Sequence, residues 1–384
     1  MNINFKCYIR KGIKMKKILF FIPNLMHGGA EKVLVNLVNN IDKNKYDITL
    51  QTIFDVGVNK QYLHEDIKYK YIFKKIFRGS TIIFKLFSPQ FLYTHLIKDE
   101  YDIVISYLEG ATSRIISGYP YNGKKVSWIH IEMNDEEKFA LGFRNSEEAR
   151  KCYKKFDEII CVSDTVKQIF LETSGLNKSN VDVLYNTNET NQIVEKSKEA
   201  VNDVVFDKNT VNICSVGKIT VTKGYDRLAR VHKRLIDEGL NHHIYILGIG
   251  EDEDKINKYI KENNLQDTYT LLGFRDNPYK YVVKCDLFVC SSLREGFSTA
   301  VTESLVVGTP VVSTLCSGAQ ELLGYNNEYG LVVENSEEGI YEGIKKLLED
   351  RELLAYYKEK AIERGSFFSK EKTVKAVEDM IDSL

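Results

Sequence analysis

The sequence predicts an α/β protein made of two doubly wound domains in tandem. Its 384 residues exceed what a single hydrophobic core usually serves. Short apolar runs typical of buried strands alternate with longer segments that have helical spacing, which implies parallel sheets with right-handed crossovers. The alternation stops at a polar, lysine-rich stretch, 191–210, and then starts again. We therefore expect a linker there and a separate domain on each side of it.

The first half opens with an apolar strand and a helix. The strand is expected over 17–23, and the helix over 30–41 follows Gly28-Gly29. A helix over 164–175 has Ser163 and Asp164 as cap candidates and ends at Gly175. Further strands are expected over 46–54, 101–108, 124–130 and 156–163, and the stretch 181–190 finishes this half.

The second half repeats the pattern. Strands are expected over 211–219, 241–250, 268–274, 284–292 and 309–314, with a sixth candidate over 331–336. Two helices, 337–350 and 370–384, close the chain. The predicted parts are an extension over 1–14, a first domain over 15–190, a second domain over 191–369 and a terminal helix over 370–384. In open sheets of this kind ligands bind at the carboxyl ends of the strands, so the cleft between two facing domains is the expected site.

Composition excludes several classes of protein. Lys and Arg number 53 against 54 Asp and Glu, so global charge does not favour nucleic-acid binding. The seven cysteines form no Cys-x-x-Cys pair, so neither a disulfide framework nor a zinc site is expected, and a reducing cytosol fits best. No apolar run approaches the roughly 20 residues that span a bilayer. Residues 1–14 lack the features of a signal peptide.

The stretch 291–310 carries the strongest chemical signal. It runs from a buried strand through a loop into a helix, with Glu295 in the loop and Glu303 inside the helix. Amides at the helix start, 298–300, suit an anion such as phosphate, and a carboxylate one turn deeper can accept both hydroxyls of a ribose. The alternative is a capping Glu295 and a solvated Glu303, and this spacing taken alone is common by chance.

Three more strand-end loops support a nucleotide site. Lys218 and Lys223 lie beside Gly217 and Gly224 after the first strand of the second half, an arrangement suited to a diphosphate. Solvated surface lysines are the alternative for either residue alone. Gly248 and Gly250 mark the end of the next strand, and Gly273-Phe274-Arg275 ends the one after it, where backbone could read a base edge.

In this order the segments resemble the family 4 retaining glycosyltransferases of the GT-B fold, above all the bacterial enzymes of capsule, exopolysaccharide and other cell-surface glycan assembly. The likeness runs from about residue 16 to the C-terminus and is weaker between 55 and 100. One departure is Lys218, where the family often has Arg, so charge is kept without the bidentate fork. The matching residues are Gly28-Gly29-Ala30-Glu31, Trp128-Ile129-His130, Tyr185-Asn186, Gly217-Lys218, Lys223-Gly224, Gly248-Ile249-Gly250, Gly273-Phe274-Arg275-Asp276-Asn277, and Glu295 to Glu303.

The resemblance implies a role for each matching residue. Glu303 would hold the ribose hydroxyls, Glu295 would contact the donor sugar, and His130 would lie near the reacting centre. The residues implied in catalysis are Glu295, His130, Lys223 and Lys218. The residues implied in donor binding are Gly28, Gly29, Gly217, Lys218, Lys223, Gly248, Gly250, Phe274, Arg275, Glu295, Gly296, Phe297, Ser298, Thr299, Ala300 and Glu303. The terminal helix would cross back onto the first domain.

The implied reaction moves a hexosyl or N-acetylhexosaminyl group from a nucleotide-sugar, with UDP-sugar preferred, to a glycan or lipid-linked acceptor. Lysines and a helix start at the leaving diphosphate would stabilise its charge and can replace a divalent metal. We therefore expect transfer with retention of configuration, without a metal or other cofactor. Front-face departure and attack is the preferred route, since no carboxylate is identified for a covalent intermediate.

Residues 68–98 are basic and aromatic. They contain seven Lys and Arg and no Asp or Glu. Such a segment suits anionic headgroups and predicts a cytoplasmic protein attached peripherally to the membrane surface. The equally weighted alternative is an amphipathic helix that packs its aromatics into the first domain.

Other functions remain open on the sequence alone. A UDP-sugar epimerase could share the architecture but would need no acceptor. A non-catalytic subunit of a two-component glycosyltransferase is expected to lack Glu303 or the phosphate-loop lysines, and both are present. A phosphorylase would be much longer, and an exported binding protein would need a signal peptide.

Overall fold

The computed structural model describes residues 15–26, 28–176 and 179–384. The predicted extension over 1–14, with Cys7, lies outside the described residues. The chain divides into two compact units. The first holds the described residues up to 128 together with 140–159 and Leu384, and the second holds 129–139 and 160–383, apart from the two residues left undescribed.

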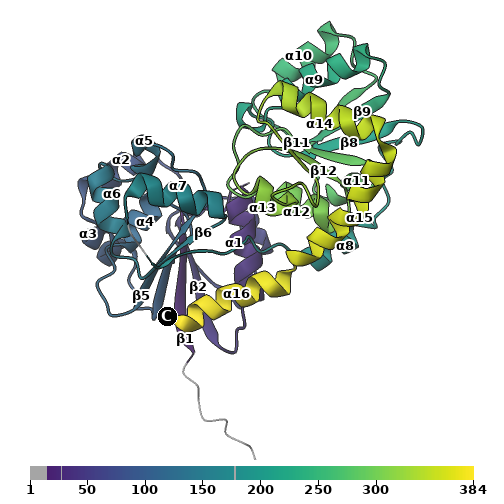
Figure 1. Ribbon diagram of the computed structural model, residues 1–384. Coiled ribbons are helices and arrows are strands. Elements are labelled where there is room, and N and C mark those ends of the chain that lie inside the picture. The colour runs from purple at the N-terminus through teal and green to yellow at the C-terminus, as the bar shows by residue number, and fades with distance from the viewer. Residues whose placement is uncertain (1–14, 27, 177–178) are drawn as a thin grey trace, which may run out of the picture. The chain divides into compact units, whose positions relative to one another are not determined.

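The first sheet has seven strands among the described residues (Figure 1). Their order is β3-β2-β1-β4-β5-β6-β7, and the registered pairs from β3 to β5 are all parallel. Ile18, Leu19 and Phe20 of β1 are fully buried, as expected for a central parallel strand. The strands are β1 Lys16–Ile22, β2 Tyr46–Phe54, β3 Lys68–Phe73, β4 Ile103–Ser106, β5 Lys124–Ile129, β6 Glu158–Cys161 and β7 Val181–Val183.

The second sheet has six strands in the described part of the chain, in the order β10-β9-β8-β11-β12-β13. All of its strand pairs are parallel. The order of both sheets follows the Rossmann pattern, which reverses direction at one switch point. In the second sheet that point lies between β8 and β11. The strands are β8 Val211–Val216, β9 His242–Leu247, β10 Tyr269–Gly273, β11 Leu287–Cys290, β12 Val311–Thr314 and β13 Leu331–Val333.

Helices cover both faces of the second sheet (Figure 1). α9, α10 and α14 pack together on one face, and α8, α11, α12 and α15 pack together on the other. The helices of the second unit are α5 Glu136–Phe139, α7 Asp164–Ser174, α8 Thr190–Ser197, α9 Tyr225–Asp237, α10 Glu253–Glu262, α11 Tyr279–Val282, α12 Thr299–Val306, α13 Ala319–Leu323, α14 Glu337–Glu349, α15 Arg351–Phe367 and α16 Lys370–Ser383, with a 3-10 turn η2 at Val221–Lys223.

The first unit has its own helices around the first sheet. α3, α4 and α6 pack together, and α4 also contacts β4. The elements are α1 Gly29–Asn40, η1 Val58–Tyr62, α2 Ser80–Leu86, α3 Pro89–Leu96, α4 Ala111–Ile116 and α6 Ser146–Tyr153.

The predicted start and end of α7 are confirmed. The Ser163 hydroxyl accepts the amide of Val166, which satisfies one of the orphan donors at the helix start. Gly175 ends the helix with φ 62°, a left-handed conformation that favours glycine.

The structure differs from the expectations in several segments. Residues 191–210 are not linker throughout, because Thr190–Ser197 forms α8 and buries Ile193. Residues 351–367 form α15, a helix that the sequence analysis did not predict. Within 181–190, the strand β7 covers Val181–Val183. Residues 68–98 are not one amphipathic helix but the strand β3 followed by α2 and α3.

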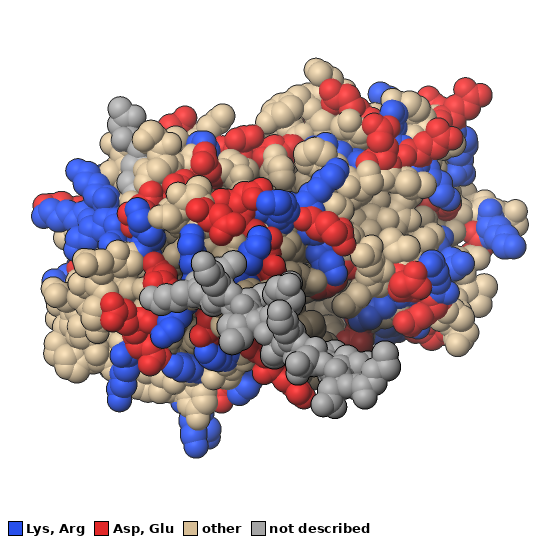
Figure 2. All heavy atoms as spheres, turned by 90° about the horizontal axis from the view of Figure 1, so that it is seen from below, with Lys and Arg blue, Asp and Glu red and all other residues tan. Residues whose placement is uncertain are grey.

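Three surface and side-chain features bear on function. The six described cysteines are free thiols, and five of them are buried. Lys and Arg are interspersed with Asp and Glu over the face shown in Figure 2. No helix within the described ranges is both long enough and apolar enough to cross a bilayer.

Candidate functional site

The site predicted in the second sheet lies at its switch point. The loop after β8 carries Lys223, and the loop after β11 carries Glu295. These loops touch through backbone, because a Cβ on Gly224 would lie 2.2 Å from the Ser291 carbonyl oxygen, and Gly224 has φ 66°. Only glycine tolerates both demands. Ligands of doubly wound sheets bind in the crevice at this position.

Lys223 and Glu295 form an ion pair across the switch point. The Lys223 Nζ lies 2.6 Å from Glu295 Oε1, with 27% and 14% of the two side chains exposed. The Ser292 hydroxyl donates to the same oxygen at 2.6 Å. Burial disfavours the charged ammonium, but the neighbouring Glu295 carboxylate outweighs that cost and raises the pKa of Lys223 above its ordinary value. The ammonium is therefore held charged and in place at the carboxyl end of the sheet.

The glycine-containing strand ends meet at the same edge. Gly248 donates its amide to the Gly273 carbonyl at 2.9 Å, which joins the ends of β9 and β10. A Cβ on Gly248 would lie 1.9 Å from the Gly217 carbonyl oxygen, and one on Gly250 would lie 2.0 Å from that of Ile219. The structure thus brings three of the predicted loops together, and glycine permits their close approach.

The helix α12 places the second glutamate in a buried setting. Ser298 caps the helix by accepting the Val301 amide, so the cap is Ser298 and not Glu295. Thr299 and Ala300 are the first two helical residues, whose amides have no partner within an α-helix. Glu303 is buried, and the Tyr279 hydroxyl donates to its carboxylate at 3.2 Å. The alternative of a solvated Glu303 is wrong.

The expected base pocket and the second lysine have more exposed positions. Phe274 is 55% exposed. The Arg275 guanidinium lies 3.1 Å from an Asp203 carboxylate oxygen and over the Tyr281 ring, which fixes the direction of the side chain. Lys218 is exposed in the loop after β8.

His130 belongs to the second unit and lies against the loop of Glu295. Its side chain is 9% exposed. A Cβ on Gly296 would lie 1.9 Å from the His130 carbonyl oxygen, so this contact requires glycine. Phe297, the next residue, stacks on Tyr185 with 5.0 Å between ring centroids, and Asn186 donates to the Phe297 carbonyl at 3.4 Å. His130, Tyr185 and Asn186 thus reach the loop that carries Glu295.

Gly28 and Gly29 lie in the first unit, at the start of α1. Gly28 precedes the helix in an extended conformation, and the Glu31 carboxylate occupies the space where its Cβ would be. Burial raises the pKa of Glu31 above its ordinary value.

The sequence analysis missed two residues that hold the site together. Arg227 is buried and donates to the Ser291 carbonyl at 2.9 and 2.6 Å and to the Ser292 carbonyl at 2.9 Å, which clamps the loop before Glu295. Tyr279 is the hydroxyl partner of Glu303. Neither residue belongs to a recognised motif. The one signal in the sequence was the position of Arg227 on the apolar face of the helix over 225–237, where a charged residue is unusual.

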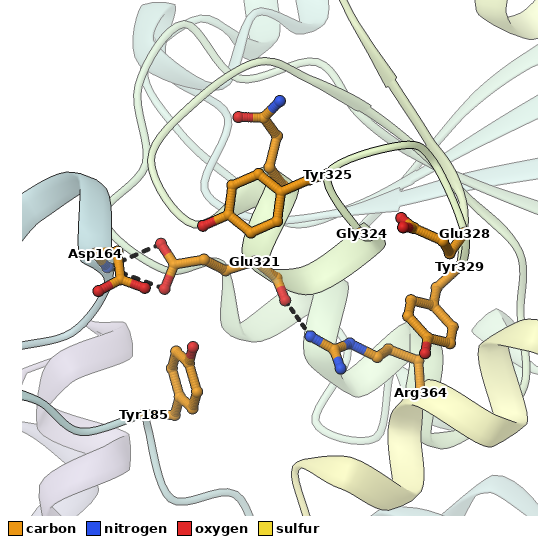
Figure 3. A pocket seen from close by; sticks show the side chains of 9 residues that line it. Asp164, Tyr185, Glu321, Gly324, Tyr325, Glu328, Tyr329 and Arg364 are labelled. Carbon is orange, nitrogen blue, oxygen red and sulfur yellow. Dashed lines mark hydrogen bonds between the residues drawn. The ribbon is translucent and has the colours of Figure 1, made fainter.

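A pocket of about 260 Å³ is lined in part by Tyr185 (Figure 3). Glu321 crosses it, and both of its carboxylate oxygens accept the Asp164 amide at 2.9 Å. Burial raises the pKa of Glu321 above its ordinary value. Arg364 donates to the Leu322 carbonyl and lies over the Tyr329 ring. The walls thus offer tyrosine rings, carboxylates and a guanidinium, groups that can contact a sugar ring or its hydroxyls.

Comparison with known proteins decides the family. Residues 27–192 match the model of Glycosyltransferase Family 4, and 196–364 match that of Glycosyl transferases group 1. The chain is 30% identical over 379 residues to a Campylobacter jejuni protein, with 93% of this chain and 97% of the relative covered. That relative is named N-acetylgalactosamine-N,N'-diacetylbacillosaminyl-diphospho-undecaprenol 4-alpha-N-acetylgalactosaminyltransferase. The chain belongs to the family 4 GT-B glycosyltransferases.

Solved structures agree on the fold of this glycosyltransferase. Anabaena HepE in complex with UDP has a TM-score of 0.74 at 17% identity, covering 96% of this chain and all of that one. Staphylococcus aureus TarM has a TM-score of 0.71 at 16% identity, covering 94% and 98%. The predicted fold and glycosyltransferase function are confirmed, and the epimerase and non-catalytic readings are not favoured.

Proposed function

We propose that this glycosyltransferase transfers a hexosyl or N-acetylhexosaminyl group from a UDP-sugar, with retention of configuration and without a divalent metal. The observation that supports it is the partly buried ion pair of Lys223 and Glu295 at the switch point of the second sheet. A fixed cation and a carboxylate at that edge suit a diphosphate and the sugar attached to it.

The donor fits the residues around this pair by chemical class. The ribose hydroxyls go to Glu303, a buried carboxylate that Tyr279 already orients. The diphosphate goes to Lys223, Lys218 and the first amides of α12. UDP is supported by the structure of Anabaena HepE in complex with UDP. Phe274 and Arg275 then line the base.

The chemistry follows from charge placement. The bond between the anomeric carbon and the phosphate oxygen breaks, and its electron pair stays on the phosphate. The acceptor oxygen bonds to the anomeric carbon on the same face, and its proton passes to the departing phosphate oxygen. Lys223 and Lys218 stabilise the negative charge that develops on the leaving group, which is usually the largest catalytic contribution. Glu295 and His130 contact the sugar near the reacting centre.

Metal independence has a direct test. Two lysines and a helix start supply the positive potential that a divalent cation provides in other transferases. Dialysis against EDTA should leave the transfer rate within about twofold of the untreated enzyme, whereas loss of activity that Mg²⁺ or Mn²⁺ restores would contradict the proposal.

The acceptor is proposed to be a glycan, in particular a lipid-linked one, in cell-surface polysaccharide or glycoconjugate synthesis. The name of the C. jejuni relative mentions a sugar linked to diphospho-undecaprenol. Such an acceptor resides in a membrane, so we place the enzyme on the cytoplasmic face, attached peripherally through residues 68–98. The absence of acidic residues from that segment supports contact with anionic lipid.

The donor proposal is tested by thermal stability with UDP, GDP, ADP and their sugar conjugates. A ligand at 100 times its Kd stabilises the folded state by about 2.7 kcal/mol. We expect uridine compounds to raise the melting temperature of the wild type and of Glu262→Gln, an exposed control on α10. The shift should be lost in Glu303→Gln and Lys223→Ala. The assignment would be contradicted if no uridine compound raised the melting temperature of the wild type. It would also be contradicted if both site variants showed the same rise as the wild type.

A further inference from the structure

Helix α2 and the turn that joins it to α3 expose a ridge of large apolar side chains. Leu86 is 70% exposed and Ile82 69%, and the other members are between 40% and 43% exposed. We call this the apolar ridge, and it consists of Ile82, Ile83, Leu86, Phe87 and Phe91. Single exposed apolar residues are ordinary, but a contiguous group of five marks an interaction surface.

The ridge is additional to the face that these helices bury. Phe84 of α2 is 6% exposed and lies beside Phe73 with 6.5 Å between ring centroids. Leu92 and Tyr93 of α3 are buried in the same unit. The helices therefore already contribute to the core, and the ridge faces away from it.

Two arginines fix the backbone beneath the ridge. Arg114, only 1% exposed, donates to the Phe84 and Phe87 carbonyls at 2.8 and 2.7 Å. Arg144 donates to the Lys85 and Leu86 carbonyls at 2.6 and 3.1 Å. These carbonyls lie at and just after the end of α2, where a helix leaves its last carbonyls without regular partners, and the Phe84 carbonyl also accepts the Phe87 amide at 3.4 Å. The exposed side chains thus project from a turn whose backbone bonds are satisfied.

Glu148 holds this clamp in position. Its carboxylate accepts from Arg114 Nε at 3.0 Å and from the terminal NH2 at 2.9 Å, a bidentate pair. The Arg144 amide also donates to Glu148, at 2.7 Å. Burying a charged arginine is costly unless a carboxylate pairs with it in good geometry. Here Glu148 provides that carboxylate in a bidentate arrangement.

Within residues 74–91, which carry the ridge, every charged residue is positive. Lys74, Lys75 and Arg78 are exposed in the loop that leads into α2, and Lys85 lies within α2. Lys60 and, to a lesser degree, Lys74 lower the pKa of the Asp55 carboxyl, so the charge of Lys74 is partly balanced. The face in Figure 2 mixes both signs of charge, whereas 68–98 contains no Asp or Glu.

We infer that the apolar ridge inserts into the interfacial region of an anionic bilayer, with these four cations at the lipid headgroups. Exposed apolar side chains flanked by Lys and Arg are the features of a surface that lies in a membrane interface. A second copy of the chain fits less well, because a twofold interface would bring the same cations of both copies together. The inference rests on the proposed peripheral attachment and names its contact surface.

Sedimentation with vesicles of phosphatidylglycerol and phosphatidylcholine at low salt tests the inference. The wild type should bind these vesicles and lose affinity in pure phosphatidylcholine. The double variant Ile82→Asp/Leu86→Asp should bind at least tenfold more weakly. The matched control Val205→Asp/Ile362→Asp, at positions 92% and 61% exposed, should bind as the wild type does. Uridine-induced thermal shifts should persist in all of them, which shows that the variants are folded.

Insertion itself has a spectroscopic readout. The only native tryptophan, Trp128, is buried, so Leu86→Trp adds an exposed probe. Its emission should shift to the blue on adding anionic vesicles and become inaccessible to an aqueous quencher. Absence of wild-type binding would overturn both peripheral attachment and this inference. If the ridge variant bound the vesicles as tightly as the wild type, or if the wild type formed an oligomer that the ridge variant did not form, only this inference would be overturned. A uridine-induced thermal shift that persists in the ridge variant shows that neither outcome bears on the donor site.

Discussion

Acidification should destabilise the second sheet through a buried pair of histidines. His232 of α9 and His242 of β9 are both fully buried, with His232 Nδ1 2.8 Å from His242 Nε2. His242 Nδ1 lies 2.9 Å from the Leu240 carbonyl, and His232 Nε2 lies 2.9 Å from the Thr268 hydroxyl. The two rings and their partners thus form one hydrogen-bonded chain.

The partners fix where the protons lie. A carbonyl only accepts, so His242 carries its proton on Nδ1 and accepts at Nε2. His232 then donates from Nδ1 and accepts the Thr268 hydroxyl at Nε2. The neutral pair satisfies every ring nitrogen. Burial, together with His242 and His243, lowers the pKa of His232 from 6.5 to about 2, and burial also lowers the pKa of His242.

The size of the effect follows from linkage. The folded pKa of His232 lies below the unfolded value of 6.5, so the unfolded state binds more protons between them. Stability is therefore complete above about pH 6.5 and declines as the pH falls, by about 1.4 kcal/mol for each pH unit. At about pH 5 His232 alone removes about 2 kcal/mol, a large share of the 5–15 kcal/mol typical of a domain.

The assay is hydrogen exchange of peptides from α9 and β9 between about pH 8 and 5. After correction for intrinsic exchange rates, it gives the free energy of local opening at each pH. We expect His232→Gln to flatten its pH dependence, because a glutamine amide can donate to His242 and accept from Thr268 without titrating. His64→Gln, at an exposed position, should leave the slope unchanged. A wild-type free energy that is constant from pH 6.5 to 5, or an unchanged slope in His232→Gln, would refute the reasoning.

Three further predictions concern the site and the arginine clamp. Lys223→Ala should lower kcat/KM for sugar transfer by about 10²-fold or more, because it removes charge at the leaving group, while the exposed Lys261→Ala should not; equal rates would count against the role of Lys223. Gly248→Ala should destabilise the protein by at least about 2 kcal/mol in urea unfolding, because its φ of 151° and the Gly217 carbonyl 1.9 Å away both exclude a Cβ; an unchanged midpoint would contradict this. Arg114→Met should cost about 3–5 kcal/mol in the same assay, because it removes a buried guanidinium together with its bonds to Glu148 and to the Phe84 and Phe87 carbonyls, and a loss under 1 kcal/mol would show that the clamp is not structural.

Periodicity and glycine positions were enough to predict most of the fold. Apolar runs such as 17–23 and 211–219 are strands because both faces of a parallel sheet are covered, which leaves a continuous signal in the sequence. The same patterns placed Lys223 and Glu295 in loops at strand ends. Parallel strands bring those ends to one edge, so the closeness of the loops also follows from the sequence.

The missed elements depend on contacts between distant segments. α15 has weak amphipathicity, since its buried residues are few and include the small Ala361 and Gly365. Gly365 fits because the Leu305 carbonyl lies where its Cβ would be, a contact that no local pattern encodes. Arg227 was missed for the same reason, because its carbonyl partners lie 64 and 65 residues away.

The ion pair of Lys223 and Glu295 shows how such long-range contacts refine a prediction made from motifs. The motifs assign Lys223 to the diphosphate and Glu295 to the sugar. In the structure the two side chains form an ion pair, with 2.6 Å between Lys223 Nζ and Glu295 Oε1. These assignments are compatible, because an ammonium has three N–H groups and Glu295 uses only one. The pair holds the lysine charged at the switch point before a donor arrives. A cation fixed in this way needs little reorganisation as charge develops on the leaving group, which is the condition under which electrostatic stabilisation is most effective.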